Sequence, residues 1–427
     1  MTLTIPVGSE ARRLRFLFGT TSGATPSSSV EDYWDGDIYW VTPEDLGKLS
    51  DRYVRETRRR ITELGYQNCS VSLAGAGSIV LSKRAPIGQT AILGVPSTCN
   101  QGCFLLSKLD DVDERFYYYA LIHLRPALEA LGRGSTFMEL SADDLRSVLM
   151  PFPREDNQRL IANYLDRETA RIDGLIAEKE RMLVLLEEKR AALISHVVTR
   201  GLDPNAPLKP SGQEWLGEIP VHWGLQRLKQ LTEVRGGLTL GKQYSGELLE
   251  YPYLRVANVQ DGYLKLDDVL TVEVPASEAA SNLLVYGDVL MNEGGDIDKL
   301  GRGCVWRDEI SPCLHQNHVF AVRPHSVDSD WLALWTSTIQ AKRYFESRAK
   351  RSTNLASISG SNIKELPVPL PPVSEQLAIQ NFLAVRHSRL ETLLSELRDS
   401  LRLLIERRAA LITAGVTGQI PLEEMAG

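Results

Sequence analysis

Two stretches of this chain repeat the same helical element, and this repeat limits what the chain can fold into. Residues 151–199 and 369–417 align without a gap at a constant offset of 218 residues, and 20 of the 49 positions are identical. Agreement of this kind over an ungapped span indicates duplication of a unit rather than shared helical composition. The chain is therefore interpreted as two halves, each consisting of a globular segment followed by one copy of the helix.

Each copy is predicted to form one long helix. Prolines precede the copies at Pro153 and Pro372, and glycines follow them at Gly201, Gly415 and Gly418, as helix ends favour. About 44 residues at roughly 1.5 Å each would make a rod of about 65 Å.

Apolar residues recur in both copies at alternating spacings of three and four, which predicts a coiled-coil seam. They are Ile172, Ile176, Leu183, Leu186 and Leu193 in the first copy, and Leu390, Leu394, Leu397, Leu401, Leu404 and Leu411 in the second. Because one helix cannot bury such a stripe alone, we expect the two copies to pack on each other. The polar breaks at Lys179, Arg190 and Arg408 could fix the register.

The remaining sequence predicts two globular domains, at residues 1–150 and 205–366, with the helical parts at 151–204 and 367–427. Short apolar runs bounded by turn residues predict strands at 37–41, 77–82 and 89–93, and residues 116–131 are predicted to be helical. The fold class is α+β: two mixed α/β domains joined by two long helices, with an internal pseudo-twofold repeat.

The second domain repeats the plan of the first more loosely. Residues 253–258 match the strand region 40–45, residues 287–291 match 77–81, His315-Gln316 matches Asn100-Gln101, and 331–345 is the second helix-like stretch. The connector at 200–224 is rich in proline, glycine and polar residues, so it is expected to be a linker more than a core element.

Bulk composition narrows the class of protein. The net charge of −7 argues mildly against a nucleic-acid binder, so any DNA contact must come from local basic loops or from partner subunits. No apolar run is long enough to cross a membrane, and the N-terminus lacks a signal pattern, so a cytoplasmic location is expected. Five cysteines without a CxxC pair argue against a disulfide framework or a structural zinc site.

A search for catalytic motifs finds little. Residues 236–242 resemble a phosphate-binding loop, but Gln243 stands where Ser or Thr must hold Mg²⁺. Cys304, Cys313, His315 and His318 do not follow a standard metal-ligand spacing. Basic residues cluster at 55–60 and 342–351. Such runs usually form a solvated face, but next to Tyr, Ser, Thr and Asn they are also suited to DNA contacts.

Several of these features together resemble the specificity subunit of type I restriction–modification systems. They are the duplicated helix with its proline entry, the Gln-x-x-Ile-x-Asn pattern at 158–163 and 376–381, the Arg-Ala-Ala-Leu-Ile close, and the connector from Trp215 to Trp223. Thr21-x-Gly-x-Thr-Pro26 and the strand at Trp40 also resemble the target recognition domains of that family. The resemblance covers essentially the whole chain.

The resemblance implies a non-catalytic subunit whose two domains each read one half of a bipartite, asymmetric site in double-stranded DNA. It implies that the helices form an antiparallel coiled coil that sets the spacer and docks two methyltransferase subunits, so the seam residues are assigned to the coil and to docking. Two ATP-driven restriction and translocation subunits would complete the complex. S-adenosylmethionine, ATP and Mg²⁺ are expected on these partners. This chain is expected to bind no cofactor or metal and no membrane.

The base-reading side chains are expected in loops at matched positions, where Arg, Lys, Asn, Gln and Ser can reach base edges. These candidates are Ser22, Arg84, Gln101 and Ser135 in the first domain, and Lys242, Arg255, Asn258, Lys299, Arg302, Gln316, Asn317 and Arg351 in the second. For any one of them, a purely structural role in a turn or sheet edge is an equally good interpretation. Two other classes of protein stay open: a fused recognition–nuclease, and a coiled-coil scaffold that binds no DNA.

Overall fold

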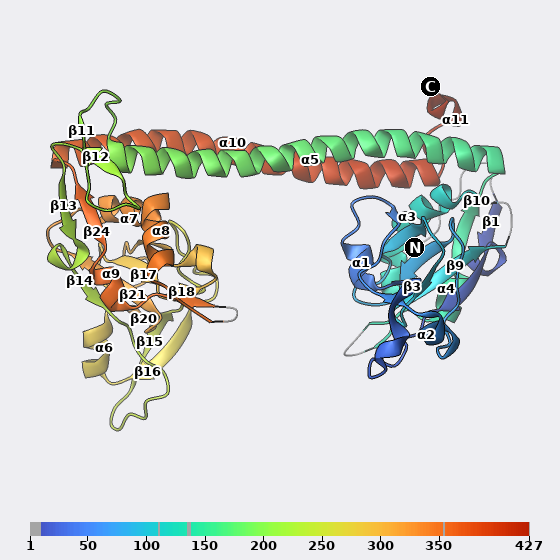
Figure 1. Ribbon diagram of the computed structural model, residues 1–427, viewed down its shortest axis with the longest axis horizontal. Helices are drawn as coiled ribbons and strands as arrows, with labels where there is room; N and C mark the ends of the chain where they lie inside the picture. Colours follow the sequence, from blue (N-terminus) through green and yellow to red (C-terminus); the bar gives the residue numbers. More distant parts are fainter. Residues whose placement is uncertain (1–9, 110–111, 135–137, 353–354, 427) are drawn as a thin grey trace. The chain divides into compact units, whose positions relative to one another are not determined.

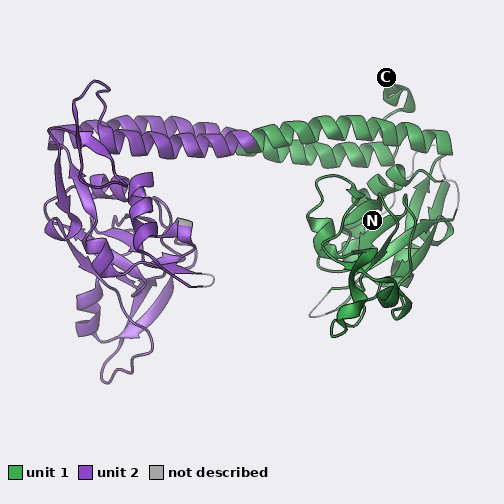
Figure 2. Cartoon of the chain, in the orientation of Figure 1, with its two compact units in different colours: residues 1–180, 398–427 green, residues 181–397 purple. Residues whose placement is uncertain are grey.

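The computed structural model describes residues 10–109, 112–134, 138–352 and 355–426. The chain divides into two compact units, which Figure 2 shows in different colours: unit 1 comprises residues 1–180 and 398–427, and unit 2 comprises residues 181–397. Both boundaries fall inside the long helices rather than at the domain borders that the sequence suggests. The reason is that each globular domain packs on its own half of both helices.

The long helices are α5 (Glu155–Arg200) and α10 (Val373–Val416), of 46 and 44 residues (Figure 1). Gly201 and Gly418 follow them with φ of +76° and +69°, the left-handed conformation in which glycine commonly ends a helix. Every predicted seam residue is buried or half-buried, with Ile172 4% and Leu394 1% exposed, whereas most of their neighbours on the helices are exposed. The two long helices and their seam are thus confirmed.

The two helices run antiparallel, and the same ion pair marks their register in each unit. In unit 1, Arg408 Nε lies 2.7 Å from Asp173 Oδ1, and in unit 2, Arg190 Nη1 lies 3.5 Å from Glu391 Oε1. Arg190 and Arg408 are equivalent under the 218-residue offset, and so are Asp173 and Glu391. Both arginines are about one-third exposed, so these pairs add little stability, but they favour one register over its neighbours.

The domain of unit 1 is built on a five-stranded sheet in the order β2-β9-β6-β7-β4, beside a three-stranded sheet in the order β5-β3-β8. Helix α3 (Glu114–Ala130) packs between the larger sheet and the long helices, where Phe116 and Leu121 share one core with Leu165 and Ile412. The predicted strands lie in β3, β6 and β7, and the predicted helix is α3. The strand bounds are β2 (Phe18–Ser22), β3 (Trp34–Val41), β4 (Tyr53–Val54), β5 (Arg60–Ile61), β6 (Ile79–Ser82), β7 (Thr90–Leu93), β8 (Ser97–Cys99) and β9 (Cys103–Lys108).

The domain of unit 2 repeats this topology. Its sheets have the strand orders β14-β21-β17-β19 and β16-β15-β20. Strands β14, β21 and β17 correspond to β2, β9 and β6 of the first domain, and β15 corresponds to β3. The predicted helix at 331–345 is wrong as a single helix. It is divided into α7 (Ser329–Ser337) and α8 (Ile339–Arg348), because Thr338 is extended and caps α8 through its hydroxyl. The strand bounds are β14 (Thr232–Arg235), β15 (Leu249–Leu254), β16 (Leu270–Val274), β17 (Val289–Asn292), β19 (Gly303–Val305), β20 (Leu314–His315) and β21 (Val319–Pro324).

The connector after α5 belongs to the core of unit 2, so its prediction as a linker is wrong. Leu216, Ile219 and Trp223 are 6%, 1% and 1% exposed, and they pack against Trp331 and Ile379. The segment after α10 likewise contributes to the core of unit 1: Met425 is 2% exposed and lies in the same core as Leu165. Pro and Gly composition marks turns but does not reveal that the apolar residues between them are buried.

The remaining elements are short. They are the helices α1 (Pro43–Gly47), α2 (Glu63–Gln67), α4 (Ala142–Ser147), α6 (Ala276–Asn282), α9 (Gly360–Lys364) and α11 (Leu422–Met425), the 3₁₀ helices η1 (Leu14–Phe16), η2 (Glu31–Tyr33), η3 (Leu228–Gln230) and η4 (Ile297–Lys299), and the strands β1 (Glu10–Arg13), β10 (Leu149–Phe152), β11 (Leu208–Pro210), β12 (Glu218–Pro220), β13 (Gly224–Arg227), β18 (Gly294–Gly295), β22 (Lys350–Arg351), β23 (Ala356–Ser357) and β24 (Pro367–Leu370). Among the described residues, none of these helices, nor α5 or α10, has an apolar stretch that could cross a membrane.

Candidate nucleic-acid interface

Loops from four parts of the first domain meet at one end of its larger sheet. Lys83 N donates to Gly102 O at 2.9 Å and Leu140 N donates to Lys83 O at 2.9 Å, which joins the turn after β6 to the loop before β9 and to the segment before α4. Gln101 and Thr25 are in direct side-chain contact. We call residues 22–30, 83–88, 99–103, 133–134 and 138–139 the first loop cluster.

Three of the four predicted DNA-contact residues of the first domain lie in this cluster. Ser22 ends β2 and is exposed, Gln101 contacts Thr25, and Arg84 lies beside Gly102 with its guanidinium 3.8 Å from Glu139. Ser135 lies outside the described residues. Side chains that are up to 79 positions apart in sequence are thus brought to one surface, as a base-reading surface requires.

Two buried tryptophans hold the loop at 23–30 in place. The indole N–H groups of Trp34 and Trp40 donate to Ser27 O at 3.1 Å and to Ala24 O at 3.0 Å, and the two rings pack edge to face at 5.1 Å. Gly23 is required because a Cβ there would lie 2.2 Å from the carbonyl oxygen of Cys99. These contacts explain why position 23 of the Thr-x-Gly-x-Thr-Pro sequence is a glycine and how the loop that follows it is held.

The second domain forms an equivalent set of loops. Glu293 N donates to His318 O and Ile358 N donates to Glu293 O, both at 2.9 Å, and Gly294 pairs with Ser357. We call residues 293–302, 315–319, 350–352 and 355–357 the second loop cluster. It brings together the predicted DNA-contact residues Lys299, Arg302, Gln316, Asn317 and Arg351. Within it, Lys299 pairs with Asp296, while Arg351 is exposed.

Three predicted DNA-contact residues of the second domain lie outside the second loop cluster. Asn258 is 3% exposed; its amide donates to Lys265 O and Asp268 O at 2.9 Å and its oxygen accepts from Arg255 N, so its side chain is buried and closes its own loop. Arg255 binds Asp268 at 2.9 Å, and Lys242 binds Glu278 at 3.1 Å. The sequence could not show these pairings, because the partners lie 3 to 36 positions away and depend on how the loops fold.

The sequence match between the two domains at His315 is shifted by one residue. Gly237 approaches His315 O as Gly23 approaches Cys99 O, so His315 corresponds to Cys99, Gln316 to Asn100 and Asn317 to Gln101. His315 is 2% exposed, and its Nδ1 lies 2.7 Å from Val319 O. Burial lowers the pKa of His315, which keeps the ring neutral, so Nδ1 donates to that carbonyl. Among the described residues no group of three His, Cys, Asp or Glu side chains is placed to hold a metal ion.

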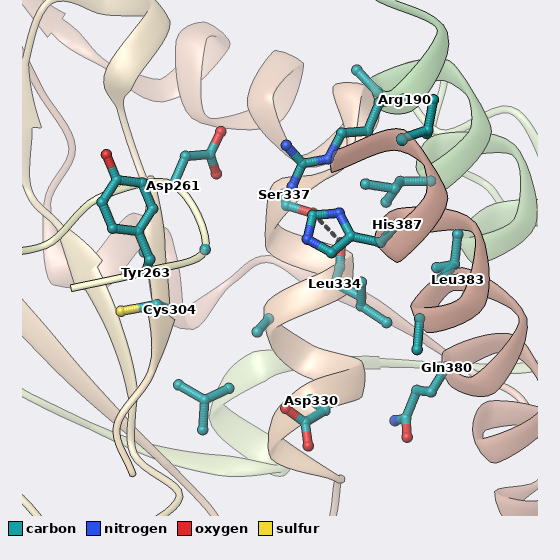
Figure 3. A pocket seen from close by; sticks show the side chains of 18 of the residues that line it. Arg190, Asp261, Tyr263, Cys304, Asp330, Leu334, Ser337, Gln380, Leu383 and His387 are labelled. Carbon is teal, nitrogen blue, oxygen red and sulfur yellow. Dashed lines mark hydrogen bonds between the residues drawn. The ribbon is translucent and has the colours of Figure 1, made fainter. Parts of the chain in front are cut away.

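A cavity of about 920 Å³ lies in unit 2 between the domain and its own halves of the helices (Figure 3). Its lining combines apolar helix residues such as Leu334 and Leu383 with charges of both signs, among them Arg190 and Asp330. Burial raises the pKa of the Cys304 thiol to about 12, so it is not a thiolate at neutral pH. The Ser337 hydroxyl donates to Leu334 O at 2.8 Å. These two groups are thus unsuited to act as nucleophiles.

Comparisons with known proteins agree with this architecture. The family model described as type I restriction modification DNA specificity domain matches residues 6–181 and 220–396. The type I restriction enzyme MjaIX specificity subunit of Methanocaldococcus jannaschii is 26% identical over 439 aligned positions, covering 99% of this chain and 95% of that protein. The EcoKI specificity subunit of Escherichia coli is 22% identical, covering 69% and 63%.

A solved structure shares the fold. A chain from a structural study of complex assembly and conformational transition of the type I R-M system superposes with a TM-score of 0.71, at 16% identity, over 97% of this chain and 99% of that chain. At this identity the likeness concerns the fold alone.

Proposed function

The chain belongs to the family of type I restriction–modification DNA specificity subunits, and from this premise we propose that it reads a bipartite DNA sequence with one recognition domain in each unit. The observation that carries this proposal is the pair of equivalent loop clusters. They sit on the same strand framework but have different side chains. Because the framework repeats and the loops differ, the two half-sites should differ in sequence. Readers of this kind usually contact half-sites about 34 Å apart, one helical turn of DNA, or more.

Sequencing of modified bases in a host that carries the complete system tests this proposal. We expect methylation at a split, non-palindromic motif, with a constant number of unspecified base pairs between its halves. Exchanging the first loop cluster for that of a relative should change one half of the motif and leave the other intact. A continuous palindrome, or a motif that changes in both halves, would contradict it.

The chain itself is proposed to be non-catalytic. The chemistry would lie on partner subunits: methyltransferase subunits that bind S-adenosylmethionine, and restriction subunits that bind ATP and Mg²⁺. A cleavage assay of the purified chain separates this role from that of a fused nuclease. DNA binding measured with the methyltransferase present separates it from a coiled-coil scaffold, which would give no salt-dependent affinity.

Docking of the methyltransferase subunits requires side chains that point away from the seam. The predicted seam residues face the other helix in each unit, so they support docking only by forming the coil. At two positions, both copies of the helix have an exposed leucine instead. Leu175 (40% exposed) is equivalent to Leu393 (47%), and Leu185 (55%) is equivalent to Leu403 (56%). Unit 1 contains Leu175 and Leu403, and unit 2 contains Leu393 and Leu185. Each unit thus has one leucine of each equivalent pair, so each could bind one copy of the same partner subunit.

Leu185→Asp and Leu403→Asp are each expected to weaken the binding of one methyltransferase subunit, and the double variant is expected to weaken both. Burying a leucine contributes about 1.5–3 kcal/mol, so each loss should be roughly 10- to 100-fold in affinity. Light scattering of the assembled complex measures the stoichiometry. Val184→Asp is the matched control, because Val184 is 57% exposed but corresponds to Arg402 in the other copy. Disruption by this control but not by the double variant would contradict the assignment.

A further inference from the structure

Four arginines in unit 1, three between β4 and β5 and one at the start of β5, differ in their partners. Arg55 pairs with Asp51 at 2.5 Å and Arg58 pairs with Glu44 at 2.8 Å. Arg59 and Arg60 have no carboxylate partner among the described residues. Their guanidinium groups lie over aromatic rings instead, at 3.6 Å from the centroid of Trp34 and 4.4 Å from that of Tyr39. The four arginines look alike in the sequence, but two of them are neutralised by a carboxylate and two are not.

The two stacked arginines border the first loop cluster. Trp34 carries Arg59 on its ring and holds Ser27 of the cluster through its indole N–H. Tyr39 carries Arg60 and pairs with Ser97 on β8, the strand that leads into residues 99–103 of the cluster. Arg59 is therefore connected to the surface that is proposed to read bases through the Trp34 ring, and Arg60 is connected to it through the pairing of Tyr39 with β8.

Stacking prepares a guanidinium for an anion. The ring fixes the plane of the group, and an arginine is more weakly hydrated than a lysine, so less ordering and desolvation is needed on binding. Its N–H donors point outward from its edge, in a fork that matches two phosphate oxygens. In a chain with a net charge of −7, cations that reach solvent and have no carboxylate partner, such as the exposed Arg59 and the half-buried Arg60, are the groups most able to release counterions from DNA.

The second domain places such cations elsewhere. In strand register Tyr39 pairs with Arg60, whereas Pro252 and Tyr253 pair with Thr271 and Leu270, so no cation occupies the equivalent positions. The exposed Lys350 and Arg351, on β22 in the second loop cluster, have no carboxylate partner among the described residues. The corresponding Arg133 of the first domain is paired with Asp144 at 3.2 Å.

We propose that Arg59 and Arg60 are phosphate anchors of the first recognition domain and that Lys350 and Arg351 take this role in the second, so the two domains hold the DNA backbone from different loops. This inference rests on the proposed function, because it assumes that both domains bind DNA. Phosphate anchors fix position and carry no base preference of their own.

Affinity measured against salt concentration tests the anchors in the full-length chain assembled with its methyltransferase subunits. The probes are a duplex with the methylated motif, in its unmodified form, and a scrambled duplex of equal length. For Arg59→Gln/Arg60→Gln we expect the slope of log affinity against log salt to fall by about two. If the affinities converge near 1 M salt, this corresponds to roughly 30-fold weaker binding at about 0.15 M. Both duplexes should lose affinity equally.

The matched control is Arg55→Gln/Arg58→Gln, which removes the same formal charge from the same turn. We expect it to change affinity less than threefold, because these arginines are already paired and diffuse charge is screened beyond about 8 Å at physiological salt. Arg59→Lys/Arg60→Lys keeps the charge without the stacking geometry and should restore part of the loss. Phosphate-ethylation interference should lose contacts at one half-site in Arg59→Gln/Arg60→Gln and at the other in Lys350→Gln/Arg351→Gln.

Failure of the anchors and failure of the proposed function give different results. A wild-type complex that does not prefer the motif over the scrambled duplex overturns the proposed function. A wild-type complex that prefers it, together with an unchanged Arg59→Gln/Arg60→Gln variant, overturns the anchors alone. Equal weakening by the control pair also overturns them, because it would reveal an effect of diffuse charge. Circular dichroism and the thermal midpoint confirm that each variant is folded.

Discussion

Trp223→Ala is expected to lower the free energy of unfolding of unit 2 by about 3–5 kcal/mol, the usual cost of truncating a buried aromatic residue. Trp223 is 1% exposed, packs edge to face on Trp331 at a centroid distance of 6.0 Å, and donates through Nε1 to Glu375 Oε2 at 3.1 Å. It therefore joins the connector, the second domain and the first turn of α10. Urea unfolding gives the overall loss, and hydrogen exchange locates it in unit 2.

Trp223→Phe is the control for this prediction. It keeps an aromatic ring in the core and removes the hydrogen bond to Glu375, so a loss of about 1–2 kcal/mol is expected. In the alanine variant, the half of the methylated motif that unit 2 reads should lose definition before the other half does. Equal loss of protection from hydrogen exchange in both units would contradict the prediction, because it would show that the connector does not stabilise unit 2 alone.

Asp166→Ala is expected to lower the free energy of unfolding of unit 1 by about 2–3 kcal/mol, because it leaves the partly buried Arg52 without its carboxylate partner and removes one of the two carboxylates that bind Arg115. Asp166 on α5 accepts hydrogen bonds from Arg52, from Arg115 Nη1 at 3.1 Å and from the Tyr119 hydroxyl at 2.9 Å. The side chains of both arginines are 25% exposed or less. Burial raises the pKa of the Tyr119 phenol, which therefore stays protonated and a donor.

Ala384→Asp is the matched control for Asp166→Ala. Ala384 occupies the position equivalent to Asp166 in the second copy, and it lines the cavity of unit 2 instead of an ionic cluster. A new carboxylate at the edge of this cavity can remain hydrated, so a change of no more than about 0.5 kcal/mol is expected. Thermal unfolding compares the two variants. Equal destabilisation by both would contradict the prediction, because it would show that the loss in Asp166→Ala is not specific to the ionic cluster.

The repeated part of the molecule could be predicted from sequence in detail. The seam from Ile172 to Leu193 and from Leu390 to Leu411, the helix ends at Gly201 and Gly418, and the strands at 79–82 and 90–93 depend on local periodicity and on backbone preferences of proline and glycine. Both signals act over a few residues, so they can be read from the chain alone.

The candidate interface could be predicted only in part. Ser22, Arg84 and Gln101 lie in one loop cluster, and their contact with bases stays a prediction. Asn258 is buried outside both clusters, which could not be predicted from sequence because it depends on hydrogen bonds to Lys265 and Asp268 in the loop that Asn258 closes. The difference between Arg58 and Arg59 was equally hidden, since Glu44 and Trp34, which separate their roles, lie 14 and 25 positions away.

The sequence by itself determined that this chain is a duplicated unit with two long amphipathic helices and two diverged domains, because duplication and periodicity are properties of residue order. Only the tertiary structure decided which charges are neutralised, which apolar residues of the connector are buried, and which loops share a surface. These depend on contacts between residues far apart in the chain, and their geometry is fixed by how the sheets and helices pack.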